Sequence, residues 1–174
     1  MEIRRLSRGD DRSAFRSGDD DLDRFFHRFA GQNQFRHHLG VTYVAVDGAI
    51  LGFATTSVTQ LVAAELPSRL DPHLPRYPLP ALRLARLAVS ASAQGRGVGL
   101  ALLLYVFRLA REMAELVGCV GVIVDAKPQA VAFYARFGFV PLATRAGRLG
   151  DRPEPAPMFL ELEAIPPGAS RGPG

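Results

Sequence analysis

Three glycines lie close together where a predicted strand gives way to a predicted helix, and they constrain this chain more than any other feature. The run Gln94-Gly95-Arg96-Gly97-Val98-Gly99 follows an apolar segment, residues 82–89, and precedes a long apolar segment that begins at Leu100. The first segment has the pattern of a buried strand and the second that of a helix. Glycine lets the backbone approach a ligand closely, and N–H groups at a helix start favour an anion, most often a phosphate. The run therefore predicts a site for a phosphate-bearing cofactor.

Length and composition predict one soluble globular domain. The chain has 174 residues, of which 48% are hydrophobic, and this is enough for a sizeable core. We expect residues 1–164 to form that domain and residues 165–174 to form a flexible tail. The chain starts without an apolar run typical of a signal peptide, contains no apolar segment long enough to cross a bilayer, and has one cysteine, Cys119. These features predict a cytoplasmic protein without an internal disulfide or a membrane anchor.

Positive charge is concentrated around the glycine run. The net charge is +4, and Lys127 is the only lysine among the 21 basic residues. Between Pro72 and Arg111 the chain has six arginines and neither aspartate nor glutamate. A surface of one sign attracts anionic partners, nucleic acid included. A compositional bias toward arginine is the alternative explanation for part of this excess.

The remaining pattern predicts a mixed α/β sheet flanked by helices. Asp19 to Asp21 offer an N-cap and a negative first turn for a helix, and Asp47-Gly48 is a typical hairpin turn. Pro128 suits a helix start and Gly138 its end, whereas the prolines between 72 and 80 indicate a loop. We expect strands at 2–6, 41–46, 49–54, 82–89, 119–124, 139–140 and 158–162, and a first helix that buries Leu22, Phe25, Phe26 and Phe29 on one face.

Four interpretations compete for the glycine run, and three of them involve a bound ligand. A P-loop requires Lys-Ser or Lys-Thr after the last glycine, but Leu100-Ala101 stands there, so this interpretation fails. A dinucleotide-binding turn requires Gly-x-Gly-x-x-Gly directly after the strand. The spacing does not match, but Asp125 ends the following strand, which keeps this interpretation open. A purely structural strand–helix junction remains open.

The third ligand-binding interpretation rests on two motifs in order. Gln94-x-x-Gly97-x-Gly99 matches the pattern Gln/Arg-x-x-Gly-x-Gly/Ala, and here the chain resembles the GNAT family of acetyl-coenzyme A-dependent N-acetyltransferases. Downstream, residues 132–139 (Ala-Phe-Tyr-Ala-Arg-Phe-Gly-Phe) are similar to the family's ending around a catalytic tyrosine. The resemblance implies a GNAT fold, that is, an α/β fold with a mixed central sheet flanked by helices, and acetyl-coenzyme A as cosubstrate.

Further segments narrow the resemblance to the GNAT toxins of bacterial toxin–antitoxin modules. These are residues 84–89, the helix start at 19–23 and Asp125-Ala126-Lys127-Pro128. The resemblance implies acetylation of the α-amine of aminoacyl-tRNA, which blocks translation, and restraint by a ribbon-helix-helix antitoxin. Two alternatives stay open: an N-acetyltransferase for a small amine or a protein N-terminus, and a catalytically silent GNAT module that binds a partner.

The resemblance also assigns roles to residues. Tyr134 matches the general acid that protonates the departing thiolate, with packing beside Phe133 and Phe137 as the alternative, and no residue matches a general base. Family likeness further suggests a homodimer. The candidates for cofactor binding are Leu87, Ala88, Val89, Gln94, Gly95, Arg96, Gly97, Val98, Gly99, Leu100 and Phe133, and those for tRNA contact are Arg28, Arg76, Arg83 and Arg86.

Metal chemistry is not predicted. His27, His37, His38 and His73 lack ligand spacing with Cys119 or with a pair of carboxylates.

Overall fold

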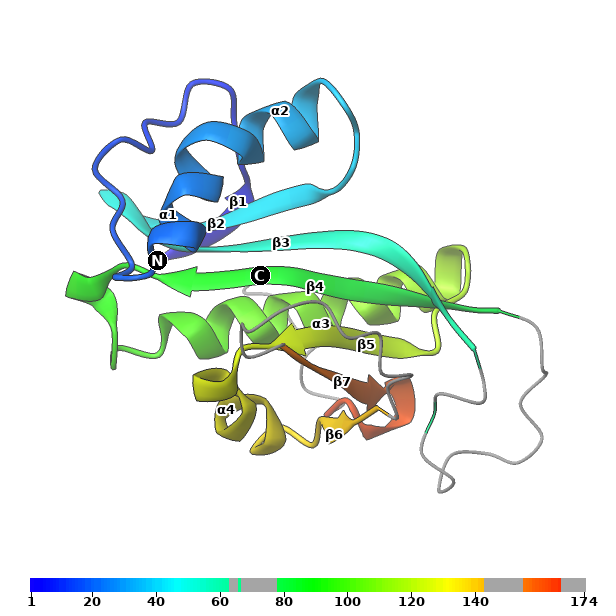
Figure 1. Cartoon of the computed structure of the whole chain (residues 1–174). Helices are drawn as coiled ribbons and strands as arrows, with labels where there is room; N and C mark the ends of the chain where they lie inside the picture. The colour runs from blue at the N-terminus through cyan, green and yellow to red at the C-terminus, as the bar shows by residue number, and fades with distance from the viewer. Residues whose placement is uncertain (63–65, 67–77, 143–154, 167–174) are drawn as a thin grey trace, which may run out of the picture. The chain divides into compact units, whose positions relative to one another are not determined.

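The computed structural model describes residues 1–62, 66, 78–142 and 155–166. Its strands form one seven-stranded sheet in the order β1-β2-β3-β4-β5-β7-β6 (Figure 1). The strands are β1 Glu2–Arg5, β2 Val41–Asp47, β3 Ala49–Leu61, β4 Leu79–Val89, β5 Gly121–Ala126, β6 Val140–Pro141 and β7 Ala156–Glu161. The helices are α1 Asp20–Arg24, α2 Ala30–Phe35, α3 Val98–Leu116 and α4 Val131–Ala135, with the π-helical turn η1 Phe25–Phe29 between α1 and α2 and short 3₁₀ turns η3 Ala91–Ala93, η4 Pro128–Ala130 and η5 Leu162–Ala164.

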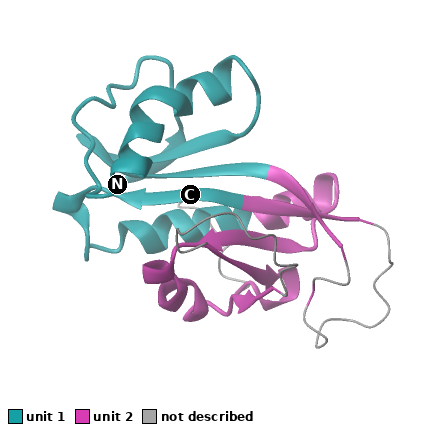
Figure 2. Cartoon of the chain, viewed as in Figure 1, with its two compact units in different colours: residues 1–57, 84–108 teal, residues 58–83, 109–174 magenta. Residues whose placement is uncertain are grey.

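Residues fall into two compact units, which Figure 2 colours separately. Unit 1 contains residues 1–57 and 84–108, and unit 2 contains residues 58–83 and 109–174. The long elements β3, β4 and α3 each have residues in both units. The boundary therefore does not separate two successive stretches of chain.

In unit 1, helices α1 and α2 cover one face of the strands and the first half of α3 covers the other (Figure 1). Aromatic rings fill the first interface: Phe26 stacks on Phe53 with ring centroids 4.3 Å apart, and Phe15 meets both rings edge-on. The predicted hairpin is confirmed, because β2 pairs antiparallel with β3 and Gly48 turns between them at φ +71°. Such left-handed backbone favours glycine.

The buried face predicted for the first helix is correct for Phe25 and Phe26 but wrong for Phe29. Phe25 and Phe26 are 4% and 0% exposed, whereas Phe29 is 45% exposed. The cause is η1, in which the Ala30 N–H bonds to the Phe25 carbonyl, five residues back. This wider turn adds a residue to the helix and rotates Phe29 away from the core.

Unit 2 is built on the antiparallel pair of β5 and β7, in which Ile123 lies opposite Phe159. These two side chains join Leu61, Leu79 and Ala81 in a buried cluster. The loop expected up to Pro80 ends earlier, because β4 begins at Leu79 and the Pro80 carbonyl accepts a hydrogen bond from the Val120 N–H at 2.8 Å.

The tail boundary also shifts. Ile165, expected to be the first tail residue, is 1% exposed, and its carbonyl accepts a hydrogen bond from Arg111. It belongs to the packed part of unit 2, while residues 167–174 lie outside the described residues. Among the helices that the structure describes, none combines the length and apolar character that a membrane span requires.

Candidate active site

The glycine run forms an exposed turn that leads into α3. Gly95 and Gly97 adopt φ angles of +75° and +81°, which side chains of other residues rarely tolerate. The first helical hydrogen bond of α3 runs from the Ala101 N–H to the Gly97 carbonyl at 3.0 Å. The N–H groups of the residues between them, Val98 to Leu100, therefore precede the helical hydrogen-bond ladder.

This turn fits an anionic group. A Cβ atom added at Gly95 or Gly97 would meet nothing within 4 Å, so open space faces the backbone there. The positive end of the helix dipole coincides with the exposed Arg96 and with three N–H groups that no earlier turn of helix can pair. A pyrophosphate such as that of coenzyme A suits this donor set.

The side chain of Gln94 anchors the turn. Its Nε2 donates to the Ser17 carbonyl at 3.0 Å and to the Val89 carbonyl at 3.3 Å. The Ala91 N–H donates to the Arg16 carbonyl at 2.8 Å. The glutamine of the motif thus joins the turn to the end of β4 and to the segment before α1.

Further hydrogen bonds, which were not predicted from the sequence, fix the segment before α1. Asp23 is buried, at 7% exposed, and its Oδ1 accepts from the Ser17 N–H at 2.8 Å and from the Ser17 hydroxyl at 2.6 Å. Asp19 caps α1 by accepting from the N–H groups of Asp21 and Leu22. The aspartates of this helix start therefore hold the Ser17 carbonyl where Gln94 can reach it. In the sequence, the only signal of this anchoring role was the group of aspartates at the helix start, Asp19, Asp20, Asp21 and Asp23.

The residues at the end of β4 differ in burial. Ala88 is buried in the unit 1 core, while Leu87 and Val89 are half-buried. Beyond them the Ser90 N–H donates to the Leu51 carbonyl of β3 at 2.8 Å. The end of the strand is therefore held firmly from the β3 side.

In unit 2, Tyr134 lies on α4 within a small aromatic group. It is 5% exposed, and its ring meets Phe133 and Phe139 edge-on at centroid distances of 5.2 and 5.4 Å. Burial raises the pKa of the Tyr134 phenol above its ordinary value of about 10, and the hydroxyl is protonated at neutral pH with or without that shift. Within the described residues this hydroxyl makes no hydrogen bond to the protein. A buried phenol of this kind can donate its proton to a reacting group.

The four arginines predicted to contact tRNA have different surroundings. Arg28 is exposed on η1. Arg83 forms an ion pair with Asp125. Arg86 lies 3.8 Å above the ring of Phe25, and burial lowers the pKa of its guanidinium. Arg76 lies outside the described residues. Among the described residues, Arg86 thus makes a cation–π contact and no ion pair.

The predicted residues fall in both units. Unit 1 carries Arg28, Arg86 and the cofactor candidates from Leu87 to Leu100, and unit 2 carries Arg83, Phe133 and Tyr134. Across the described residues, no group of three or more His, Cys, Asp and Glu side chains is placed to hold a metal ion.

Comparison with known proteins decides the family. The profile of the acetyltransferase (GNAT) domain matches residues 38–141. The chain belongs to the GNAT acetyltransferase family. This GNAT protein is 32% identical over 137 residues to the tRNA-acetylating toxin of Mycobacterium tuberculosis (strain ATCC 25618 / H37Rv), a match that covers 78% of this chain and 82% of the toxin. Family membership confirms the predicted fold class and acetyl-coenzyme A as cosubstrate.

Solved structures agree with this fold. AtaT complexed with acetyl-methionyl-tRNAfMet superposes with a TM-score of 0.82 at 23% identity, covering 94% of this chain and 95% of AtaT. AtaTR bound with acetyl-coenzyme A gives a TM-score of 0.74 at 26% identity, with 94% and 95% coverage. The KacTA–DNA complex gives 0.72 at 25% identity, with 94% of each chain covered. The likeness to GNAT toxins thus extends over nearly the whole chain.

Proposed function

We propose that this GNAT protein acetylates the α-amine of aminoacyl-tRNA and thereby blocks translation. The observation that carries the proposal is the 32% identity to a tRNA-acetylating toxin over most of both chains. An anion-binding turn and a buried, protonated tyrosine in the same chain supply the parts that acetyl transfer needs. Charged tRNA is a cytoplasmic substrate, so the proposal places the protein in the cytoplasm.

The glycine turn and β4 are proposed to bind the cosubstrate, which supplies an acetyl group activated as a thioester. The N–H groups from Gln94 to Leu100 hold the pyrophosphate, and Arg96 adds positive charge. The backbone of Leu87 to Val89 pairs with the pantetheine amides as an added strand would. An N–H of Ala88 or Val89 stabilises the negative charge that develops on the carbonyl oxygen. Phe133 contributes apolar contact.

Tyr134 is proposed as the general acid. The neutral α-amine attacks the thioester carbon, so that a C–N bond forms and the C–S bond breaks. The Tyr134 hydroxyl donates its proton to the departing sulfur, and the proton lost by the amine returns to the phenolate through water. The Tyr134 phenol, whose pKa burial raises further above neutrality, is protonated before each turnover.

The partners follow from the same relatives. AtaT has been solved bound to the C-terminus of the antitoxin AtaR, and we propose that a ribbon-helix-helix antitoxin restrains this chain too. Arg28, Arg76, Arg83 and Arg86 remain proposed tRNA contacts, and a homodimer is proposed because two copies enlarge the basic surface. A monomeric mass at micromolar concentration would contradict the dimer.

Charged bulk tRNA incubated with the protein and labelled acetyl-coenzyme A tests the function. We expect label on the aminoacyl ends, and mass spectrometry of the released N-acetyl amino acids identifies the preferred tRNA. Uncharged tRNA is the control, because it lacks the α-amine. Labelling of small amines or protein N-termini, with none of charged tRNA, would reject the proposal in favour of another acceptor.

A further inference from the structure

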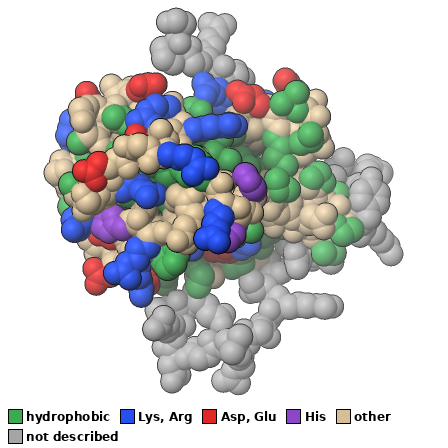
Figure 3. Space-filling view, turned by 90° about the horizontal axis from the view of Figure 1, so that it is seen from above, with side chains coloured by type: hydrophobic (Ala, Val, Ile, Leu, Met, Phe, Trp, Pro, Cys, Tyr) green, Lys and Arg blue, Asp and Glu red, His purple; other side chains and the backbone are tan. Residues whose placement is uncertain are grey.

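A basic pocket of about 440 Å³ opens in unit 1 between the segment after β1 and helix α2. Its lining includes four arginines, Arg8, Arg12, Arg28 and Arg36, together with Gly31 and Phe35. Figure 3 looks down on the α1–α2 side of the molecule and shows basic side chains spread across this face. The pocket shares no residue with the glycine turn, and within unit 1 α2 and the start of α3 cover opposite faces of the strands (Figure 1). It is therefore not the cosubstrate site.

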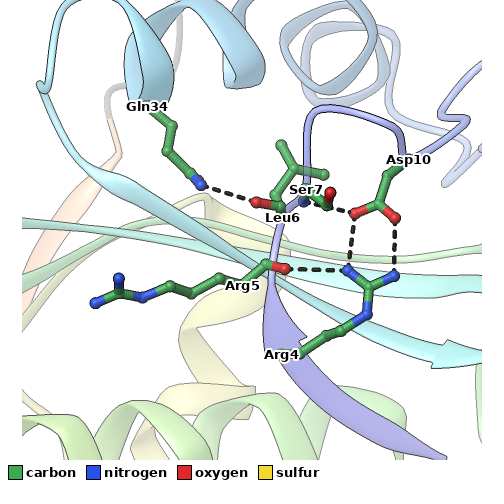
Figure 4. A network of polar contacts seen from close by, with 6 residues as sticks. All are labelled: Arg4, Arg5, Leu6, Ser7, Asp10 and Gln34. Atoms are coloured by element: carbon green, nitrogen blue, oxygen red, sulfur yellow. Dashed lines mark hydrogen bonds and ion pairs between the residues drawn. The ribbon is translucent and has the colours of Figure 1, made fainter.

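The positive charges of this pocket are not paired with neighbouring carboxylates. In the part of the chain that the structure describes, Arg8, Arg12, Arg28 and Arg36 form no ion pair. Asp10 belongs to the same loop, but Arg4 donates to both of its oxygens at 2.9 and 2.8 Å (Figure 4). The hydrogen bonds from Arg4 are the largest cause of the lowered pKa of Asp10, and the nearby charge of Arg12 lowers it further.

Backbone and side-chain contacts hold two of the four arginines, Arg8 and Arg12, in place before any ligand arrives. The Arg12 guanidinium packs on α2 at Gly31, where an added Cβ would lie 2.8 Å from Nη1. Arg8 lies 4.7 Å above the ring of Phe35 and donates to the Phe35 carbonyl. The loop itself is fixed by the Ser7 N–H, which donates to Asp10 at 2.7 Å (Figure 4).

Gln34 fixes the helix side of the pocket. Its Nε2 donates to the Leu6 carbonyl at 2.9 Å (Figure 4), and its Oε1 accepts from the Thr42 N–H at 2.8 Å. Helix α2 is thereby tied to the end of β1 and to β2. Prearranged cations of this kind bind an anion with a smaller loss of side-chain entropy than mobile ones.

We propose that this pocket binds phosphodiester groups in the body of the tRNA substrate, away from the aminoacyl end. Guanidinium groups match phosphate oxygens in geometry as well as charge. One phosphodiester carries a single charge, whereas four arginines line this pocket, so a chain of phosphates fits better than an isolated ion. The inference rests on the proposed tRNA substrate and adds a second contact region for it.

Binding of labelled tRNA at several salt concentrations, without acetyl-coenzyme A, tests the pocket independently of catalysis. We expect Arg12→Gln and Arg36→Gln each to weaken binding about threefold to tenfold and to lower the salt slope by about 1 for each phosphate that the variant no longer neutralises. Gly31→Ala should act like Arg12→Gln, because the new methyl displaces that guanidinium. Arg24→Gln is the matched control, since Arg24 is exposed on α1 and already paired with Asp21. If the salt dependence of tRNA binding had the same slope in all these variants as in the unmodified protein, the inference would be overturned.

Kinetics then separate this inference from the proposed function. With charged tRNA, Arg12→Gln and Arg36→Gln should raise KM and leave kcat unchanged. With an aminoacylated trinucleotide, which has the reacting end but no tRNA body, the variants should match the unmodified protein. Failure of the unmodified protein to acetylate either substrate would reject the proposed function alone, because the binding measurement still tests the pocket. A different result would identify a small-ligand site: free nucleotides stabilise the unmodified protein against unfolding but not Arg12→Gln, while Arg12→Gln binds tRNA as tightly as the unmodified protein. That result would overturn the tRNA assignment.

Discussion

The glycine turn and helix α4, which carries Tyr134, are proposed to serve acetyl transfer in opposite ways. At the turn, the groups proposed to act are backbone N–H groups, exposed to solvent and shaped by two glycines with positive φ. On α4 a single side-chain hydroxyl is proposed to act, and it is buried in an aromatic group that raises its pKa. Substitutions in the glycine turn should therefore have graded effects, mainly on the binding of acetyl-coenzyme A. Substitution of Tyr134 should have a severe effect, mainly on the rate of the chemical step.

Tyr134→Phe should produce the largest effect. We expect kcat to fall by about 10²- to 10⁴-fold, the usual contribution of a positioned general acid, with little change in KM for acetyl-coenzyme A. Stability should change little, because the hydroxyl bonds to no described residue. Steady-state kinetics and a thermal melt measure both effects. Tyr43→Phe is the control, since Tyr43 is also 5% exposed; full turnover in Tyr134→Phe would remove the general-acid role.

Gly97→Ala should give a moderate effect confined to binding. The φ of +81° at Gly97 costs an alanine about 1–2 kcal/mol, so the turn should relax and KM for acetyl-coenzyme A should rise by about tenfold. Gly48→Ala offers the same strain, at φ +71°, in the hairpin between β2 and β3. Both variants should lose similar unfolding free energy, while only Gly97→Ala should alter KM. An unchanged KM would mean that these glycines serve only the strand–helix junction.

Gln94→Ala should give a smaller effect in the same direction. It removes the hydrogen bonds to Ser17 and Val89, a loss of about 1 kcal/mol, and KM for acetyl-coenzyme A should rise about threefold to fivefold. Gln34→Ala is matched, because Gln34 also joins two segments of unit 1 through its amide. It should lower stability without affecting that KM. Equal KM changes in the two variants would indicate general loosening of unit 1 rather than a specific anchor.

The two regions also differ in how far the sequence could predict them. The geometry of the glycine turn was predictable from spacing, because glycines with positive φ and a helix start are local properties of the chain. The environment of Tyr134 was only partly predictable from the sequence, because its neighbour Phe139 is placed by tertiary packing. The contacts of Ser17 with Asp23 and of Arg86 with Phe25 depend on which loops meet. The exposure of Phe29 followed from one extra residue in a helical turn, which a period of 3.6 does not anticipate.

Asp10→Asn should lower the stability of the fold while leaving the glycine turn and Tyr134 functional. The hydrogen bonds from Arg4 lower the pKa of Asp10 in the folded protein, so this carboxylate stabilises the fold at pH values above its unfolded pKa of about 3.9. That contribution is lost as the pH falls through the lower folded value. We expect Asp10→Asn to reduce the unfolding free energy by about 1 kcal/mol at pH 7, an amount limited by the partial exposure of Arg4. The difference in unfolding free energy from the unmodified protein should shrink below pH 4 in denaturant titrations.

Asp21→Asn is the control for this prediction. It lies in the exposed pair with Arg24 and should change stability little at either pH. A change in kcat or in KM for acetyl-coenzyme A in Asp10→Asn would show that the catalytic regions respond to general stability, and the contrast between turn and tyrosine would then lose its basis.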